Sequence, residues 1–385
     1  MFVYFGAFLA LAVFLSYVQF LPWSWATRLT LGAVSFLLAT RVAILRYFFG
    51  GIGGIEAPRS LLLVTSFLQG FLVILLLLAL LRLFSLIFLV LLSHWPTAPG
   101  RFFGLLKVWV WSPKGALTIA ILAALLSAQS LYQAARVPAL KRAEISLQAW
   151  PKNLDGLTVA ILADLHISRF FDRPWVEAVV ARTMAQKPEL ILLPGDMVDG
   201  SVEQRVADVA PLAELKAPLG VFACVGNHEY YSGVAEWLPA FERLGLKVLY
   251  NSHAVIAPRG VPLVVAGLTD LTALEKRFNL PGPDLAKALA GAPAAPVILL
   301  EHRPVRAAHN ARNPRIIWQI SGHTHGGMLP VLKSVVEKVN GGFVVGWYEV
   351  GSLKLFVQPG LGLWNGFPMR LFDPSEITLL TIRSA

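Results

Sequence analysis

Five short motifs rich in aspartate and histidine could bind metal ions in this chain. They are Asp164-Leu165-His166, Gly195-Asp196-Met197-Val198-Asp199-Gly200, Gly226-Asn227-His228-Glu229, Glu301-His302-Arg303-Pro304 and Ser321-Gly322-His323-Thr324-His325-Gly326-Gly327. Taken singly, each has an ordinary explanation as a turn or a helix cap. Because all five directly follow apolar runs of strand length, together they predict one metal site.

The donor atoms are sufficient for two ions. One set is Asp164, His166 and His325. A second set is Asn227, His302 and His323. Asp196 could bridge both ions with its two carboxylate oxygens. Oxygen and nitrogen ligands without thiolate suit Mn²⁺, Fe or Zn²⁺, and two such ions can hold a phosphoryl group and activate a bridging water.

His228 and Asp199 are predicted to act on the substrate and not on the metal. His228 neighbours a ligand, so its side chain should point another way, toward a leaving oxygen to which it could give a proton. Asp199 could orient the ring and raise the pKa of its imidazole, which favours the charged form. Structural or surface roles are expected for Glu229, Asp270, Glu301, His253 and His309.

An α/β domain over residues 155–385 is expected to position these motifs. Strand-like runs cover residues 158–163, 190–193, 221–225, 263–266, 297–300 and 316–320, with late strands near 342–356 and 376–382. Helical patterns at 174–186 and 235–244 separate several of them. Because sites in open α/β sheets form at the carboxyl ends of strands, the motifs should converge there.

Residues 1–135 read as a membrane anchor, followed by a linker at 136–154. Three stretches, 2–21, 29–49 and 116–135, are long and apolar enough to cross a bilayer. Residues 61–92 form a fourth that is either one long helix or a span plus an interfacial segment, so four spans are expected, with five as the alternative. The first stretch lacks the features of a cleaved signal peptide and should be retained.

The charge distribution fits lipid headgroups and not nucleic acid. The net charge is +10, and the first 150 residues hold 11 Lys and Arg against two acids, Glu56 and Glu144. These cations stand singly at the ends of apolar stretches, as they do at membrane surfaces. Nucleic-acid binding is therefore not expected. A single cysteine, Cys224, excludes an intrachain disulfide.

The motif set resembles the calcineurin-like metallophosphoesterase superfamily, whose signature is D-x-H, G-D-x-x-D, G-N-H-[DE], a later H and G-H-x-H. The stretches Gly-Asn-His-Glu-Tyr-Tyr and Gly-His-Thr-His-Gly-Gly, and the tail from Pro368 to Ile377, look like the bacterial membrane-associated branch that includes the YkuE and YaeI phosphodiesterases. Met328 and Trp364-Asn365-Gly366 depart from that branch. Neither departure touches a ligand, so they bear on the substrate.

The resemblance implies an α/β/β/α sandwich with a dinuclear centre, with His228 as the catalytic histidine. It implies Asp164, His166, Asp196 and His325 at one metal, and Asp196, Asn227, His302 and His323 at the other. The function expected is that of a membrane-anchored phosphoesterase that hydrolyses a phosphodiester or pyrophosphate, including one carried by a lipid, by attack of a metal-activated water. The expected location is the bacterial inner membrane. The alternative is a non-catalytic metal-binding membrane protein with a sensing or structural role.

Overall fold

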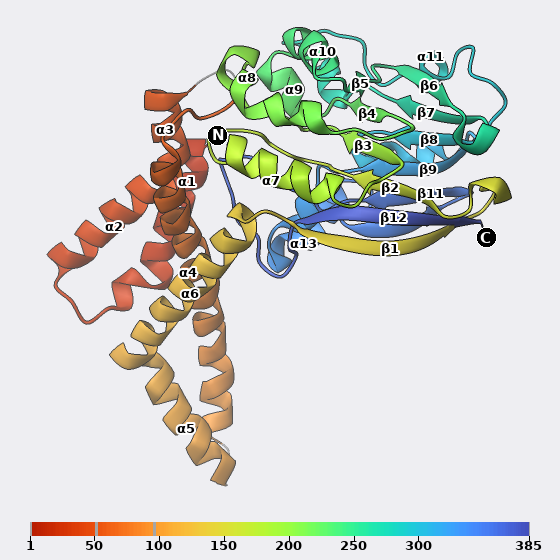
Figure 1. Ribbon diagram of the computed structural model, residues 1–385. Coiled ribbons are helices and arrows are strands. Elements are labelled where there is room, and N and C mark those ends of the chain that lie inside the picture. Colours follow the sequence, from red (N-terminus) through yellow and green to blue (C-terminus); the bar gives the residue numbers. More distant parts are fainter. Residues whose placement is uncertain (1, 51–52, 95–97, 385) are drawn as a thin grey trace. The chain divides into compact units, whose positions relative to one another are not determined.

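The chain divides into two compact units. The computed structural model describes residues 2–50, 53–94 and 98–384 (Figure 1). A helical unit comprises Met1–Gly50 and Ala57–Tyr132, and an α/β unit comprises Gly51–Glu56 and Gln133–Ala385. A short stretch that lies between two helices in the sequence therefore belongs to the α/β unit.

The helical unit contains the apolar segments. Its helices are α1 (Phe2–Ser16), α2 (Trp25–Ala39), α3 (Arg41–Phe49), α4 (Arg59–Ser93), α5 (Ala98–Trp111) and α6 (Pro113–Ala135), with a 3-10 turn at Val18–Phe20. In the described residues, three helical stretches are long and apolar enough to cross a membrane: Val3–Phe20, α4 and α6. The predicted long apolar run is one continuous helix, α4.

The second expected span is broken. Helices α2 and α3 meet at Thr40 with a bend of 54°, and the pair counts as a fourth span only if taken together. The Thr40 hydroxyl donates to the Phe36 carbonyl at 2.7 Å, a side-chain bond to a preceding turn that accompanies bends in apolar helices. Helix α5 was not expected as a separate element.

Two polar residues inside the apolar segments bind each other. The Arg41 Nε donates to Gln69 Oε1 at 2.7 Å, and both side chains are buried. A charge in an apolar environment is costly unless it is paired or hydrogen-bonded. This contact therefore explains how α3 and α4 tolerate Arg41 and Gln69.

The α/β unit is built on two six-stranded sheets, which confirms the predicted α/β architecture. The first has the order β1-β12-β2-β3-β4-β5 and the second β10-β11-β9-β8-β7-β6. The first sheet consists of β1 (Ala139–Leu147), β2 (Leu157–Ile161), β3 (Leu190–Pro194), β4 (Val221–Cys224), β5 (Lys247–Val248) and β12 (Glu376–Ser384). The second consists of β6 (Ser252–Ile256), β7 (Leu263–Gly267), β8 (Val297–Leu300), β9 (Ile316–Ser321), β10 (Gly346–Val350) and β11 (Leu353–Val357).

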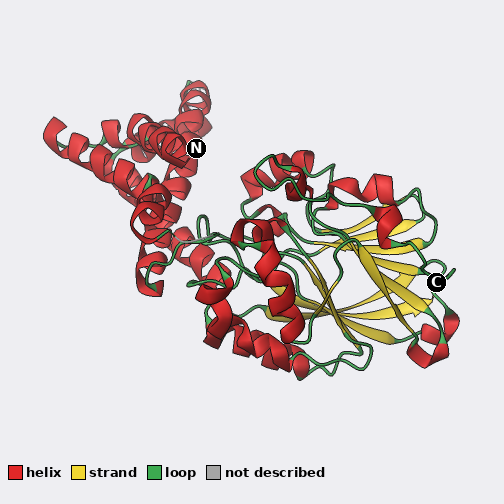
Figure 2. Cartoon of the chain, turned by 90° about the horizontal axis from the view of Figure 1, so that it is seen from above, coloured by secondary structure: helices red, strands yellow, loops and turns green. Residues whose placement is uncertain are grey.

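The two sheets pack face to face. One cluster of buried side chains draws on both, including Ile161 and Leu192 from the first and Ile298 and Trp318 from the second. Helices lie on both sides of the strands (Figure 2). They are α7 (Arg173–Met184), α8 (Val202–Val209), α9 (Asn227–Ser232), α10 (Val234–Arg243), α11 (Leu285–Ala288), α12 (Ala307–Asn310) and α13 (Pro330–Val339).

The expected linker contains a strand. β1 pairs in parallel with β12 over nine positions, from Ala139 with Glu376 to Leu147 with Ser384. β12 in turn runs antiparallel to β2. The remaining neighbours in the first sheet, β2, β3, β4 and β5, are parallel, so the carboxyl ends of β2, β3 and β4 lie at one edge.

We expect Leu192→Ala to lower the free energy of unfolding of the α/β unit by about 2–5 kcal/mol, because Leu192 is fully buried between the sheets and its removal leaves a cavity. Urea unfolding of the full-length protein in detergent, followed by near-UV circular dichroism, measures this. Val255→Ala is the control, since that side chain is 49% exposed. An equal loss in both variants would contradict the assigned core.

Candidate metal centre

The predicted site residues all lie just beyond the carboxyl ends of five strands, three in the first sheet and two in the second. Asp164 and His166 follow β2, Asp196 and Asp199 follow β3, Asn227 and His228 open α9 after β4, His302 follows β8, and His323 and His325 follow β9. Because the inner faces of the two sheets pack together, these strand ends meet.

The acidic and histidine side chains form three overlapping groups with geometry suitable for holding an ion. Within each group the donor atoms lie within 4.8 Å of one another. The groups are Asp164, His166 and His325; His166, Asp196 and His228; and Asp196, His302 and His323. Asp196 belongs to two of these groups, and so does His166.

Distances within the cluster place Asp196 between donors from both sheets. Its Oδ2 lies 3.0 Å from His302 Nε2 and 3.8 Å from His166 Nε2. His325 Nε2 lies 3.3 Å from His166 Nε2 and 3.9 Å from an Asp164 oxygen. Several lone pairs thus point into the same small spaces, and a cation bound there would offset their mutual repulsion.

The side chain of Asn227 is a further candidate donor. It is 5% exposed, and its Oδ1 has no hydrogen-bond partner among the described residues. A buried carbonyl oxygen without a partner is costly, so an orphaned atom of this kind fits a metal ligand. The donors are oxygen and nitrogen, and Cys224 is buried in β4 without contributing, so the residues fit the Mn²⁺, Fe or Zn²⁺ class.

The backbone at the ligands is held in an unusual conformation. Five candidate ligands have positive φ: Asp164 (54°), His166 (46°), Asp196 (53°), His323 (71°) and His325 (50°). Residues with a Cβ rarely adopt this region, and such residues cluster at functional sites. Here the positive-φ conformation turns the side chains that follow each strand toward the same cluster.

Two glycines let these turns approach each other. A Cβ on Gly226 would collide with the Asp196 carboxylate, and a Cβ on Gly322 would collide with that of Asp164. These close approaches explain why Gly precedes Asn227 and His323 in their motifs.

Glu229 fixes the Asp196 turn, a role that the motif analysis left undefined. Its fully buried carboxylate accepts backbone N–H groups from Asp196 (3.0 Å), Met197 (2.7 Å), Val198 (3.3 Å) and Gly226 (2.6 Å). The signal in the sequence was its place three residues after Gly226, where the acid of a capping box stands.

Arg370 fixes the loop on the other side of the cluster. Its guanidinium is fully buried and donates to the carbonyls of Pro359 (2.7 Å), Gly360 (3.1 Å), Gly362 (3.1 Å) and His325 (3.3 Å). In the sequence, Arg370 stands out only as part of the tail that resembles the family. Its role could not be predicted, because only the tertiary fold brings its four carbonyl partners together.

Asp199 contacts two histidines of the cluster. Its Oδ1 pairs with His228 Nδ1 in a short hydrogen bond and lies 3.3 Å from His166 Nδ1. A carboxylate on one ring nitrogen directs the other nitrogen toward a metal or a substrate. His228 keeps 14% of its side chain exposed, whereas the Asp199 side chain is 1% exposed.

The electrostatic environment shifts the histidines in both directions: Asp196 raises the pKa of His302 to about 10 against the effect of burial, as neighbouring carboxylates do for His228, whereas the pKa values of His323 and His325 are lowered. Burial opposes charge on His228, but Asp199 and then Asp196 outweigh it and raise the pKa of His228 to about 9. Burial and the neighbouring His302 lower the pKa of His323, and burial and His166 lower that of His325. Neutral imidazole is the form that binds metal.

The remaining polar residues have structural partners. Asp270 pairs with Arg303 at 3.1 Å, and Glu301 with Arg306 at 3.2 Å. His253 Nδ1 lies 2.8 Å from the Ala288 carbonyl.

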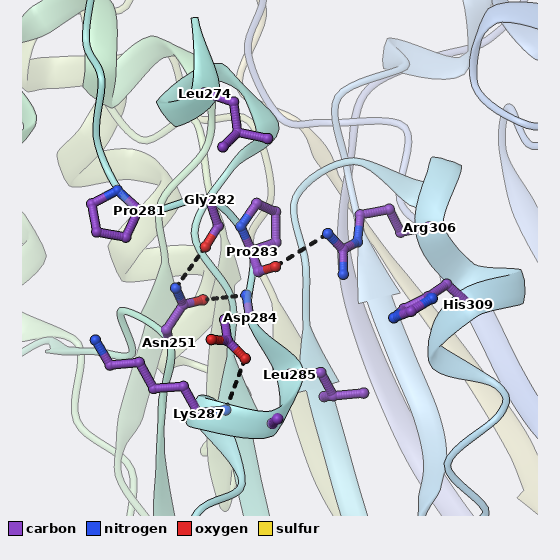
Figure 3. Close-up of a pocket in the computed structure, with 11 residues that line it drawn as sticks. Asn251, Leu274, Pro281, Gly282, Pro283, Asp284, Leu285, Lys287, Arg306 and His309 are labelled. Atoms are coloured by element: carbon purple, nitrogen blue, oxygen red, sulfur yellow. Dashed lines mark hydrogen bonds between the residues drawn. The ribbon is translucent and has the colours of Figure 1, made fainter.

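A pocket of about 570 Å³ also lies in the α/β unit, away from the metal-ligand cluster (Figure 3). None of the candidate ligands lines it. His309 and Arg306 do, and Asn251 bonds the Gly282 carbonyl and the Asp284 N–H across its wall. Its polar groups hold the loop together, so this pocket adds no chemistry to the cluster.

We expect Glu229→Gln to weaken Mn²⁺ binding by about 10- to 100-fold, because the amide cannot accept four backbone N–H groups and the Asp196 turn loosens. Isothermal titration of the chelator-stripped full-length protein measures the affinity. Glu236→Gln, an exposed acid on α10, should bind Mn²⁺ as the unaltered protein does. Unchanged affinity in Glu229→Gln would remove this role from Glu229.

The chain is similar to known metallophosphoesterases. Residues 157–327 match the calcineurin-like phosphoesterase family. A transmembrane protein with metallophosphoesterase domain from Danio rerio is 34% identical over 273 residues, 69% of this chain and 62% of that protein. The uncharacterized metallophosphoesterase YkuE of Bacillus subtilis is 29% identical over 245 residues, 61% of this chain and 82% of that protein.

Among solved structures, a 5'-nucleotidase precursor from Thermus thermophilus aligns with a TM-score of 0.39 at 18% identity, over 58% of this chain and 54% of that one. The chain spans 62%, 54% and 60% of the lengths of three curated relatives. The family match starts at β2 and ends two residues after His325. The chain therefore contains a calcineurin-like metallophosphoesterase domain.

Proposed function

We propose that the chain is a membrane-bound, metal-dependent hydrolase of phosphodiester or pyrophosphate bonds. The observation that carries this is the position of Asp196, which forms one group of donors with His166 and His228 and another with His302 and His323. A purely structural metal site would be closed and would not need a partly exposed histidine paired with a buried carboxylate.

Two sets of residues would hold two divalent ions. We assign Asp164, His166, Asp196 and His325 to one ion. We assign Asp196, Asn227, His302 and His323 to the other. When bound, such ions polarise a phosphoryl group and lower the pKa of a nearby water. The left-handed turns after the strands keep these side chains in place before any ion binds, which reduces the reorganisation that binding requires.

His228 would protonate the leaving oxygen. Its Nδ1 is occupied by Asp199, so Nε2 is the nitrogen available to a substrate. The raised pKa keeps this imidazole charged at neutral pH, and a charged imidazole can give a proton to a departing alkoxide. Asp199 is assigned the role of orienting the ring and stabilising its charge.

A lipid-linked substrate and a location in the bacterial inner membrane are also proposed. The α/β unit is joined to the helical unit at three points of the chain, before Gly51, after Glu56 and before Gln133. Three covalent junctions favour a substrate held in the same membrane. The Danio rerio relative is likewise named a transmembrane protein.

Asp196→Asn should abolish hydrolysis of bis-p-nitrophenyl phosphate, and His228→Ala should lower kcat by about 10²- to 10⁴-fold, because one removes the shared ligand and the other the proton donor. The assay uses detergent-purified full-length protein with Mn²⁺, and p-nitrophenyl phosphate reports monoester cleavage. His309→Ala is the matched histidine control. Stoichiometric Mn²⁺ without turnover of any ester would favour a binding role over hydrolysis.

A lipid preference has its own test. A dialkyl pyrophosphate presented in mixed micelles should be cleaved with a kcat/KM at least about tenfold above that of a soluble nucleotide pyrophosphate, a difference of about 1.4 kcal/mol. The phosphate monoester product is measured for both at equal bulk concentration. Equal rates would remove the lipid-linked substrate while leaving the hydrolase intact.

A further inference from the structure

A stretch from between two helices of the anchor is part of the α/β unit. Residues 53–56 lie between α3 and α4 in the sequence, yet their contacts assign them to the α/β unit. Ile55 is 2% exposed, and its carbonyl accepts the Asn365 Nδ2–H at 3.3 Å. The Asn365 loop continues into the residues that Arg370 fixes beside the cluster.

Glu56 binds a buried arginine. Its Oε2 accepts Arg169 Nε at 3.1 Å and forms a shorter ion pair with Arg205. The Arg205 side chain is 0% exposed, and its other carboxylate partner is Asp208 at 2.8 Å. A buried guanidinium depends on such partners, because burial alone lowers its pKa and disfavours its charge.

Arg205 lies against the turn that carries Asp199. A Cβ on Gly200 would come within 3.2 Å of Arg205 Nε, so the guanidinium and the turn are in close contact. Glu56 therefore acts on this turn through one intermediate side chain.

Gly53 contacts the same turn through Ser232. Gly53 has φ +75°, and a Cβ there would come within 2.9 Å of Ser232 Cα. Ser232 Oγ accepts the Gly200 N–H at 3.1 Å. The Cβ position of Gly54 lies 3.4 Å from the Asp199 carbonyl, an ordinary contact. Residues 53–56 thus lie close to the turn at residues 199 and 200, Gly53 through Ser232 and Glu56 through Arg205.

We propose that residues 53–56 are a positioning element of the phosphoesterase site, with Gly53 and Glu56 as its positioning residues. They hold the turn that bears Asp199, and Asp199 holds the rings of His228 and His166. The stretch touches no reacting atom and acts through Asp199. The anchor therefore supplies part of the catalytic domain besides tethering it. This inference rests on the proposed hydrolase activity.

Paired substitutions in the full-length protein test the proposal. Gly53→Ala introduces a Cβ against Ser232, and Gly291→Ala is its control, because Gly291 has the same φ of 75° and nothing within 4 Å of its Cβ position. Glu56→Gln removes the charge beside Arg205. Glu177→Gln is its control, an exposed acid paired with Arg173 at 2.7 Å.

Hydrolysis of bis-p-nitrophenyl phosphate with Mn²⁺ is measured for each variant, alone and combined with Asp199→Asn. Gly53→Ala and Glu56→Gln should each lower kcat by about tenfold with KM changed less than about threefold, since a small misplacement of a catalytic group costs rate. In protein that already carries Asp199→Asn, each of the two substitutions should lower kcat by less than about twofold, because the effects of coupled positions are not additive. The two control variants should match the unaltered protein.

A second readout needs no turnover. In protein labelled with ¹⁵N-histidine, the Nδ1–H resonance of His228, assigned by its loss in His228→Ala, should shift in Gly53→Ala and stay in place in Gly291→Ala. An unshifted resonance, or an equal loss of kcat with and without Asp199→Asn, would overturn the proposal. Absence of turnover in the unaltered protein would instead overturn the proposed function.

Discussion

The whole cluster depends on one carboxylate, Asp196, facing histidines from two different sheets. The sheet containing β2, β3 and β4 and the sheet containing β8 and β9 must bring their carboxyl ends to one place for this contact to exist. The shared core between the sheets sets that alignment, because Leu192 and Ile298 pack in one cluster. The packing of the two sheets therefore also determines how close the candidate metal-binding side chains come to one another.

Backbone strain at the ligands is balanced by two buried charged side chains. Asp196 and His325 both have positive φ, a conformation that a chain leaves unless its surroundings hold it. The carboxylate of Glu229 binds four N–H groups around Asp196, and the guanidinium of Arg370 binds four carbonyls around His325. Glu229 accepts hydrogen bonds and Arg370 donates them, so each turn is held by one buried side chain with four backbone partners.

The convergence of the Asp- and His-rich motifs at strand ends could be predicted from the sequence because each has a local signal, a short apolar run followed by a polar turn. Their binding of metal stays a prediction. The strand β1 could not be predicted, since its sequence is polar and alternating and its partner β12 lies more than 200 residues later. The bend at Thr40 was missed because hydropathy does not register one hydroxyl bonding back to Phe36. The contacts of Gly53 with Ser232 were likewise beyond reach, because a glycine-rich stretch between apolar runs predicts only a turn.

The discontinuous α/β unit also restricts how the chain can be threaded through a bilayer. A folded domain lies on one side of a membrane, so the chain that leaves it after Glu56 must return to that side by Gln133. The intervening segment must then cross an even number of times. Helices α4 and α6, the two stretches in this part of the described chain that are long and apolar enough to cross, satisfy that parity. The number of crossings between Glu56 and Gln133 is thus constrained by a short loop of the α/β unit, independently of the charges that flank the helices.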